Sequence, residues 1–260
     1  MKEIKNIAYS THDACLLDLY LPEETHFPVF IYFHGGGLTS GSRAGVNTFL
    51  HELISHGIAV ASADYRMYPD ANYPDFIEDA AKAVAWVKTH VGEYGKCDGI
   101  FVGGSSAGGY LSMMLCFDEH YLTAEDVSPS DIAGYVHDAG QPTAHFNVLK
   151  YKGIDPRRII VDESAPLYHI GKSEHYPPMH FIVSDNDMEN RYEQTMLVLS
   201  TLKHFELDAT VSHTIMHGTH CAYCSVKKDV RAENGEYAFG VIIRDFIEKQ
   251  LAQTEVTGRT

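Results

Sequence analysis

The stretch that decides the fold is GIFVGGSSAG, residues 99–108. Its first half is a short apolar run typical of a buried strand, and residues 110–115 beyond it have a helical pattern. The GSSAG pentapeptide between them matches G-x-S-x-G, in which a sharp turn from strand to helix exposes the central serine. We therefore expect Ser106 to be a nucleophile. Gly104 and Gly108 flank it because such a turn has no room for larger side chains.

A second glycine-rich motif, HGGG at residues 34–37, directly follows the apolar run 28–33. When a carbonyl group is attacked, its oxygen gains negative charge, and backbone N–H groups that already point at this position stabilise it. Glycines let the backbone approach that oxygen closely. We expect the amides of Gly35 and Gly36, together with that of Ala107 after the serine, to form such an oxyanion hole.

A serine hydroxyl needs a base to remove its proton, and in this kind of site the chain order is serine, acid, histidine. Two histidines follow the last predicted strand, residues 210–216. We prefer His220 because a loop beyond the strand lets an imidazole reach the serine, and His217, at the strand end, is the alternative. His213, inside the strand, is the weakest candidate.

The acid should follow the preceding strand, predicted at residues 180–183. A carboxylate there holds the histidine in the correct tautomer and stabilises the imidazolium that forms during attack. Asp187 is preferred because it lies one turn beyond the strand end. Asp185 is the alternative, although an aspartate at such a place commonly shapes the turn. Glu189 is a more distant third carboxylate.

Strand-like and helix-like apolar patterns alternate along the whole chain, without a linker or repeat that divides it. This alternation predicts an α/β fold in a single domain, residues 1–260, with a mostly parallel sheet and helices on both of its faces. Residues 117–130 and 139–168 have weaker periodicity, so we expect loops and short helices there that form a small lid or substrate wall. The predicted strands are 14–21, 28–33, 58–63, 99–103, 132–136, 180–183 and 210–216, and the predicted helices are 74–91, 110–115, 191–205 and 238–251.

The composition excludes several classes of partner. Of the 260 residues, 20 are Lys or Arg and 35 are Asp or Glu, and the resulting net charge of −15 disfavours nucleic acid and anionic membranes. No apolar run reaches the ~18 residues of a membrane span, and residues 1–6 do not begin a secretory signal. We therefore expect no membrane association and a cytoplasmic location.

The five cysteines do not predict a disulfide framework in a chain of this size. Cys221 and Cys224 form a C-x-x-C motif beside clustered histidines, but neither a second C-x-x-C nor an H-E-x-x-H motif accompanies them. The motif also follows the final predicted strand, whereas thioredoxin-like proteins place it near the start of a βαβ unit. We therefore expect no metal site, no redox centre of that type and no cofactor.

These motifs resemble the hormone-sensitive-lipase-like esterases of the α/β-hydrolase superfamily, and the related bacterial acetyl-esterase and acetylxylan-esterase-like proteins. Asp187 falls where the family has its acid, and Gly218-Thr219-His220 is similar to the family's Gly-x-His, with Cys221 where glycine is common. Few residues precede His34, so the resemblance implies an α/β-hydrolase fold without a large N-terminal cap. The likeness extends over nearly the whole chain and includes Asp64-Tyr65-Arg66, Pro69, Pro74, Asp79, Trp86 and Ala165-Pro166-Leu167.

From these residues and this resemblance we expect a serine carboxylesterase that hydrolyses short-chain acyl esters, and acetyl esters in particular, through Ser106, His220 and Asp187 and an acyl-enzyme. The expected partner is a small-molecule ester, and the family likeness allows a homodimer. Two alternatives stay open: an amidase of the arylformamidase type with the same triad, and a hydrolase fold retained for binding without catalysis.

Overall fold

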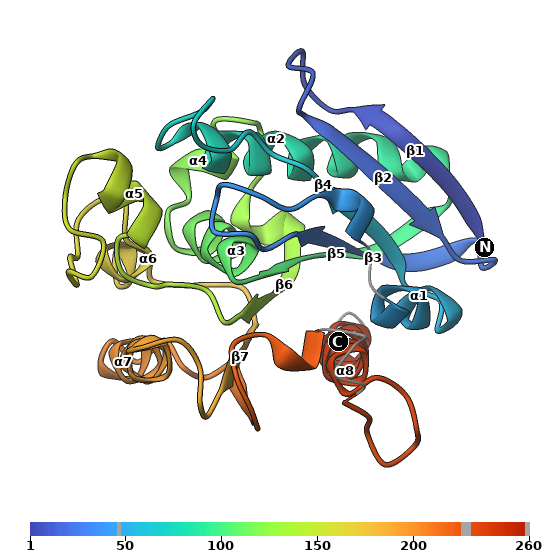
Figure 1. Ribbon diagram of the computed structural model, residues 1–260. Helices are drawn as coiled ribbons and strands as arrows, with labels where there is room; N and C mark the ends of the chain where they lie inside the picture. Colours follow the sequence, from blue (N-terminus) through green and yellow to red (C-terminus); the bar gives the residue numbers. More distant parts are fainter. Residues whose placement is uncertain (46–47, 225–229, 258–260) are drawn as a thin grey trace.

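The computed structural model describes residues 1–45, 48–224 and 230–257, and it is built around an eight-stranded sheet (Figure 1). The strands lie in the order β1-β2-β4-β3-β5-β6-β7-β8. The pairs β1–β2 and β2–β4 are antiparallel, and every later pair is parallel. The strands are β1 Lys2–Ala8, β2 Leu16–Leu21, β3 His26–Phe33, β4 Ala59–Ala63, β5 Lys96–Ser105, β6 Ile132–Asp138, β7 Met179–Ser184 and β8 Val211–Met216.

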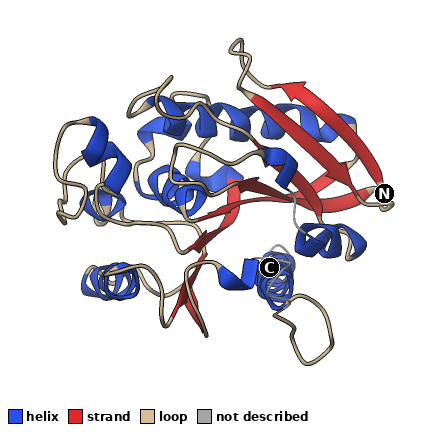
Figure 2. Ribbon diagram, in the orientation of Figure 1, coloured by secondary structure: helices blue, strands red, loops and turns tan. Residues whose placement is uncertain are grey.

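Helices cover both faces of the sheet, as Figure 2 shows. α2 and α3 pack on one face, and α1 and α8 pack on the other. The predicted mostly parallel sheet with helices on both faces is therefore confirmed. The helices are α1 Thr48–Ser55, α2 Asp75–His90, α3 Ala107–Phe117, α4 His120–Thr123, α5 Phe146–Tyr151, α6 Pro166–His169, α7 Arg191–His204 and α8 Ala238–Thr257, and 3₁₀ turns lie at Arg43–Gly45, Val91–Glu93, Pro129–Asp131 and Ala222–Cys224.

The central strand β3 shows why an unbroken apolar run forms a strand here. Successive side chains of a strand point to opposite faces. Val29 and Ile31 therefore enter the core beneath α2 and α3, whereas Phe30 and Tyr32 enter the core beneath α1 and α8. All four side chains are buried, as expected for a parallel sheet that is covered on both faces.

Two elements were not predicted from the sequence. β1 pairs with β2 at the edge of the sheet, and most of its side chains are exposed, so it has no apolar alternation to indicate a strand. α1 is short, with eight residues. The weakly periodic segments 117–130 and 139–168 do contain loops and the short helices α4, α5 and α6, as predicted.

The parallel strands bring distant loops together at one edge of the sheet. The carboxyl ends of parallel strands meet there, and this is where α/β proteins bind ligands. The HGGG motif follows β3, the predicted nucleophile follows β5, and the predicted acid and base follow β7 and β8. No helix within the described ranges is long and apolar enough to cross a membrane.

Candidate active site

Ser106 lies in a strained turn between β5 and α3. Its backbone has φ 56° and ψ −110°, a conformation that residues other than glycine rarely adopt. The Ser106 N–H donates a hydrogen bond to the Asp138 carbonyl oxygen at 2.8 Å. A Cβ at Gly104 or Gly108 would lie 2.5 or 1.9 Å from the Phe33 carbonyl oxygen, so neither position accepts a side chain. The close packing of β3 against the turn therefore explains why both positions are glycine.

His220 joins Ser106 to Asp187. Its Nε2 lies 2.8 Å from Ser106 Oγ, and its Nδ1 lies 2.5 Å from Asp187 Oδ1. Because a carboxylate only accepts hydrogen bonds, the proton of the neutral imidazole belongs on Nδ1, which leaves Nε2 as an acceptor for the serine hydroxyl. The Asp187 side chain is fully buried, and the backbone N–H groups of Ser184 and Met188 also donate to it.

The two partners shift each other's pKa in opposite directions. Burial would raise the pKa of Asp187, but the hydrogen bond and charge of His220 outweigh it and lower that pKa. Burial would lower the pKa of His220, but the hydrogen bond to Asp187 and the contact with Cys221 raise it above its ordinary value. The imidazole is therefore a stronger base than a free histidine.

The HGGG loop lies against Ser106. A Cβ at Gly35 would be 3.3 Å from the Ser106 Cβ, and Gly36 has φ +120°, which favours glycine. Ala107 is the first residue of α3, and the first N–H groups of a helix have no partner within the helix. Among the described residues, the amides of Gly35, Gly36 and Ala107 have no hydrogen-bond acceptor, so they are free for a ligand oxygen.

His34, the first residue of the motif, holds this loop in place. Its ring is buried and stacks on Tyr65 with the ring centroids 4.5 Å apart. The hydroxyl of Tyr65 donates to the His34 carbonyl oxygen at 2.8 Å, and His34 Nδ1 lies 2.7 Å from the Gly35 carbonyl oxygen. These contacts fix the HGGG turn next to Ser106.

The alternative base and acid form a pair of their own. His217 Nδ1 lies 2.5 Å from Asp185 Oδ2, and the His217 side chain is 97% exposed. The Gly218 N–H donates to the other oxygen of Asp185, which therefore shapes the turn. The structure thus brings Asp187 and His220 to Ser106, whereas Asp185 and His217 meet each other at the surface.

A cavity of about 650 Å³ opens directly onto Ser106 and His220. Phe146, Asn147 and Met188 form part of its wall. Phe146 and Asn147 belong to the segment 139–168 that the sequence analysis predicted as a substrate wall. The remaining lining residues are Tyr32, Gly35, Gly36, Gly37, Thr39, Ser105, Cys221 and Cys224.

One residue of this region was missed in the sequence. Asp138, at the end of β6, is fully buried, and burial raises its pKa to about 6. It accepts hydrogen bonds from the Tyr223 hydroxyl and from the Cys224 thiol, the latter at 3.1 Å. The only signal in the sequence is weak: Asp138 and His137 follow the predicted apolar strand 132–136.

Comparison with known proteins places this site in a family context. The family model BD-FAE matches residues 17–148, which include Gly35, Gly36 and Ser106. The probable carboxylic ester hydrolase LipM of Mycobacterium tuberculosis is 40% identical over 92 residues, 34% of this chain and 21% of the relative. The probable carboxylesterase 13 of Arabidopsis thaliana is 29% identical over 155 residues, 51% of this chain and 47% of the relative. The chain thus spans less than half the length of these curated relatives.

Solved structures with the same fold include several esterases. Esterase B from Lactobacillus rhamnosis superposes with a TM-score of 0.78 at 18% identity and covers 99% of this chain and 88% of its own. A hyperthermophilic esterase from the archaeon Pyrobaculum calidifontis superposes with a TM-score of 0.71 at 20% identity, over 96% of this chain and 86% of its own. A truncated carbohydrate esterase from gut microbiota also superposes with a TM-score of 0.71, at 18% identity and over 97% of both chains. These likenesses confirm the predicted α/β-hydrolase fold.

Proposed function

The chain belongs to the BD-FAE family, and on that premise we propose that it is a serine carboxylesterase acting on short-chain acyl esters. The observation that carries the proposal is the continuous hydrogen-bonded path from Asp187 through His220 to Ser106. The relatives named as carboxylic ester hydrolase and carboxylesterase support the same reaction.

In the proposed mechanism, His220 Nε2 takes the proton of Ser106 Oγ as that oxygen attacks the ester carbonyl carbon. The buried Asp187 carboxylate stabilises the imidazolium. The negative charge on the carbonyl oxygen is held by the free amides of Gly35, Gly36 and Ala107. His220 then protonates the leaving alcohol, and water repeats the same steps on the acyl-enzyme to release the acid.

The proposed preference for short acyl chains, and for acetyl esters in particular, comes from the resemblance to the acetyl esterases, and the cavity beside Ser106 is where the acyl group would lie. The HGGG loop lies against the serine on one side, and Phe146, Asn147 and Met188 stand on the wall of the 650 Å³ cavity. The gut-microbial carbohydrate esterase with the same fold suggests acetylated carbohydrates as one group of esters to test.

A fluorophosphonate label tests the nucleophile, because it reacts covalently with an activated serine. We expect one label per chain, mapped to the peptide with Ser106, and its loss in Ser106→Ala. Ser105→Ala is the matched control, since the neighbouring serine instead accepts a hydrogen bond from the Tyr32 hydroxyl and lines the cavity. A label that survives in Ser106→Ala would refute the proposed nucleophile.

Turnover of p-nitrophenyl acetate, butyrate and octanoate tests the substrate class. We expect the rate to fall as the acyl chain lengthens. The matching anilide separates an esterase from an amidase with the same triad, because the proposal predicts much faster ester than anilide turnover. Faster anilide turnover would favour the arylformamidase type, and labelling without turnover of either would favour a binding role.

A further inference from the structure

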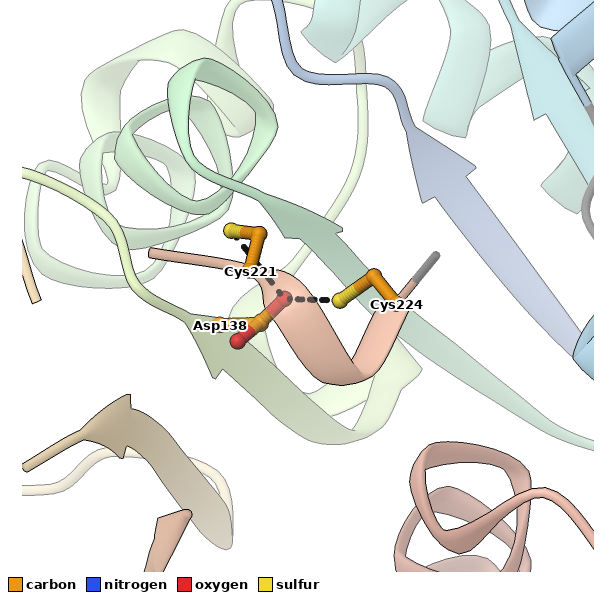
Figure 3. A group of neighbouring side chains, drawn as sticks. All are labelled: Asp138, Cys221 and Cys224. Atoms are coloured by element: carbon orange, nitrogen blue, oxygen red, sulfur yellow. Dashed lines mark hydrogen bonds between the residues drawn. The ribbon is translucent and has the colours of Figure 1, made fainter. Parts of the chain in front are cut away.

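Beside the proposed triad, two thiols and a carboxylate meet in a cluster that the esterase mechanism does not use (Figure 3). Asp138 ends β6, next to the strand that leads into Ser106, and it is fully buried. Cys221 and Cys224 belong to the loop after β8. Asp138 Oδ2 lies 3.1 Å from Cys224 Sγ and 4.0 Å from Cys221 Sγ, and the three possible ligand atoms all lie within 4.8 Å of one another.

We propose that Asp138, Cys221 and Cys224 bind a thiophilic divalent cation such as Zn²⁺, and that the bound cation inhibits the esterase. The C-x-x-C motif alone did not predict a metal site because no further ligand pair follows it in the sequence. The fold supplies the missing ligand from β6, a distant part of the chain.

The distances suit a tetrahedral zinc site. With Zn–S bonds of about 2.3 Å and Zn–O bonds of about 2.0–2.2 Å, sulfur and oxygen ligands of one ion lie roughly 3.5 Å apart. The two observed sulfur-to-oxygen distances, 3.1 and 4.0 Å, fall on either side of that separation. Small side-chain rotations are therefore enough to place all three atoms around one ion.

The surroundings of Asp138 already orient its carboxylate as a metal ligand. The buried Tyr223 hydroxyl donates to Oδ1, which leaves Oδ2 facing the two thiols. A hydrogen bond to the oxygen that does not bind the metal is the usual support of a ligating carboxylate. The backbone of the same residue is also held, because its carbonyl oxygen accepts from the Ser106 N–H.

The cluster is reached from the active-site cavity. Cys221 and Cys224 line that cavity together with Ser105 and His220, so an ion can enter without unfolding. Binding replaces the two thiol protons, which pass to solvent, and the ion is held by two thiolates and one carboxylate. The fourth position of a tetrahedral ion stays open for water or an imidazole.

Inhibition follows from the position of Cys221, which is the residue after His220. Its Sγ lies 3.7 Å from His220 Nε2, the atom proposed to take the serine proton. An ion on Cys221 disfavours a second positive charge on that imidazole, and it can capture Nε2 as its fourth ligand. The inhibition rests on the proposed esterase function, whereas the binding does not.

The test uses the full chain, reduced and freed of metal with a chelator that is then removed. Cd²⁺ is titrated while the ultraviolet charge-transfer band of cadmium thiolate is recorded, and Zn²⁺ binding is measured by calorimetry. We expect one ion per chain and a loss of at least about tenfold in affinity, or about 1.4 kcal/mol, in Cys221→Ser, Cys224→Ser and Asp138→Asn. Cys97→Ser is the matched control, because this half-buried thiol lies at the start of β5, at the end of the strand opposite to Ser106.

Esterase turnover gives the second readout. Zn²⁺ should suppress the wild-type rate at least about tenfold, a chelator should restore it, and the rate of Cys224→Ser, relative to its own metal-free value, should respond far less. Equal inhibition of wild type and Cys224→Ser would show that zinc binds at Ser106 and His220 themselves, and it would overturn the proposal. Absence of a stoichiometric cadmium band in the reduced protein would overturn it as well.

Folding of the variants is checked by circular dichroism. If Cys224→Ser does not fold, the wild-type thiols are instead blocked reversibly with a methanethiosulfonate, and removal of the block must restore the cadmium band. Fluorophosphonate labelling of the metal-free protein reports on the proposed esterase independently. A missing label with a normal cadmium band would refute the esterase and leave the metal site intact, and the reverse result would refute the metal site alone.

Discussion

Gly35→Ala tests whether the HGGG loop presents its amides to the reacting carbonyl. The added Cβ would lie 3.1 Å from the Ser105 carbonyl oxygen and 3.3 Å from the Ser106 Cβ. Both contacts are tighter than ordinary van der Waals contact, so the loop must move away from Ser106 by a few tenths of an ångström. The donors of the proposed oxyanion hole move with it.

The size of the effect follows from what that movement does to the hydrogen bonds. Complete loss of one oxyanion donor costs about 3–4 kcal/mol, or 10²–10³ in kcat. Here the donor is displaced and not removed, so we expect kcat to fall about 10- to 100-fold. KM should change little, because the charge that the amides are proposed to stabilise develops only in the transition state.

Steady-state kinetics with p-nitrophenyl acetate measure this effect, and urea unfolding checks that the fold is kept. Gly92→Ala is the control, since a Cβ there meets nothing within 4 Å and its φ is not positive. It should leave kcat unchanged. A wild-type kcat in Gly35→Ala would refute the reasoning, as would a fall explained entirely by unfolding.

Three further predictions concern the base, the pH profile and stability. His220→Ala should lower kcat/KM by about 10³-fold or more, whereas His217→Ala, at an exposed side chain, should stay near wild type. The reverse ranking would transfer the base role to His217. Although burial lowers the pKa of His220, the hydrogen bond to Asp187 raises it overall, and a protonated imidazole cannot accept the serine proton. The measured kcat/KM should therefore fall as the pH drops through an apparent pKa above the ordinary value of about 6.5, and a profile that stays flat to about pH 5 would contradict a histidine base. Asp79→Ala breaks the ion pair in which the buried Asp79 accepts from the partly exposed Arg66 at 2.7 and 2.8 Å, so urea denaturation should show a loss of about 2 kcal/mol in the free energy of unfolding. A loss below about 1 kcal/mol would show that the pair contributes little.

The parts of the site that could be predicted are those that local sequence determines. The turn at Ser106 needs a buried strand before it, a helix after it and glycines on both sides, and all of these lie within residues 99–115. The HGGG loop is also determined by local sequence, because it directly follows β3. In both cases the steric demand of one close backbone contact fixes the residue type.

From the sequence, the two candidate acids and the two candidate bases could only be ranked. His217 and His220 both follow β8, and Asp185 and Asp187 both follow β7. Which candidate of each pair reaches Ser106 depends on which side chains the turns direct inward. The side chain of Asp187 is buried and that of His217 is almost fully exposed, and this difference arises from the packing of whole loops.

The Asp138 cluster could not be predicted, because its members are brought together by the sheet alone. Asp138 contacts Cys224, which lies 86 positions further along the chain. No spacing rule connects a strand end in β6 with a loop after β8. The predicted single domain, homodimer and cytoplasmic location stay predictions.

The most direct test of the central claim is to trap the acyl-enzyme. The protein is mixed with p-nitrophenyl acetate, quenched in acid during turnover, and examined by intact mass and peptide mapping. We predict one acetyl group on Ser106, absent in Ser106→Ala and in His220→Ala. An acetyl group on Cys221 or Cys224, or continued turnover in Ser106→Ala, would contradict the account.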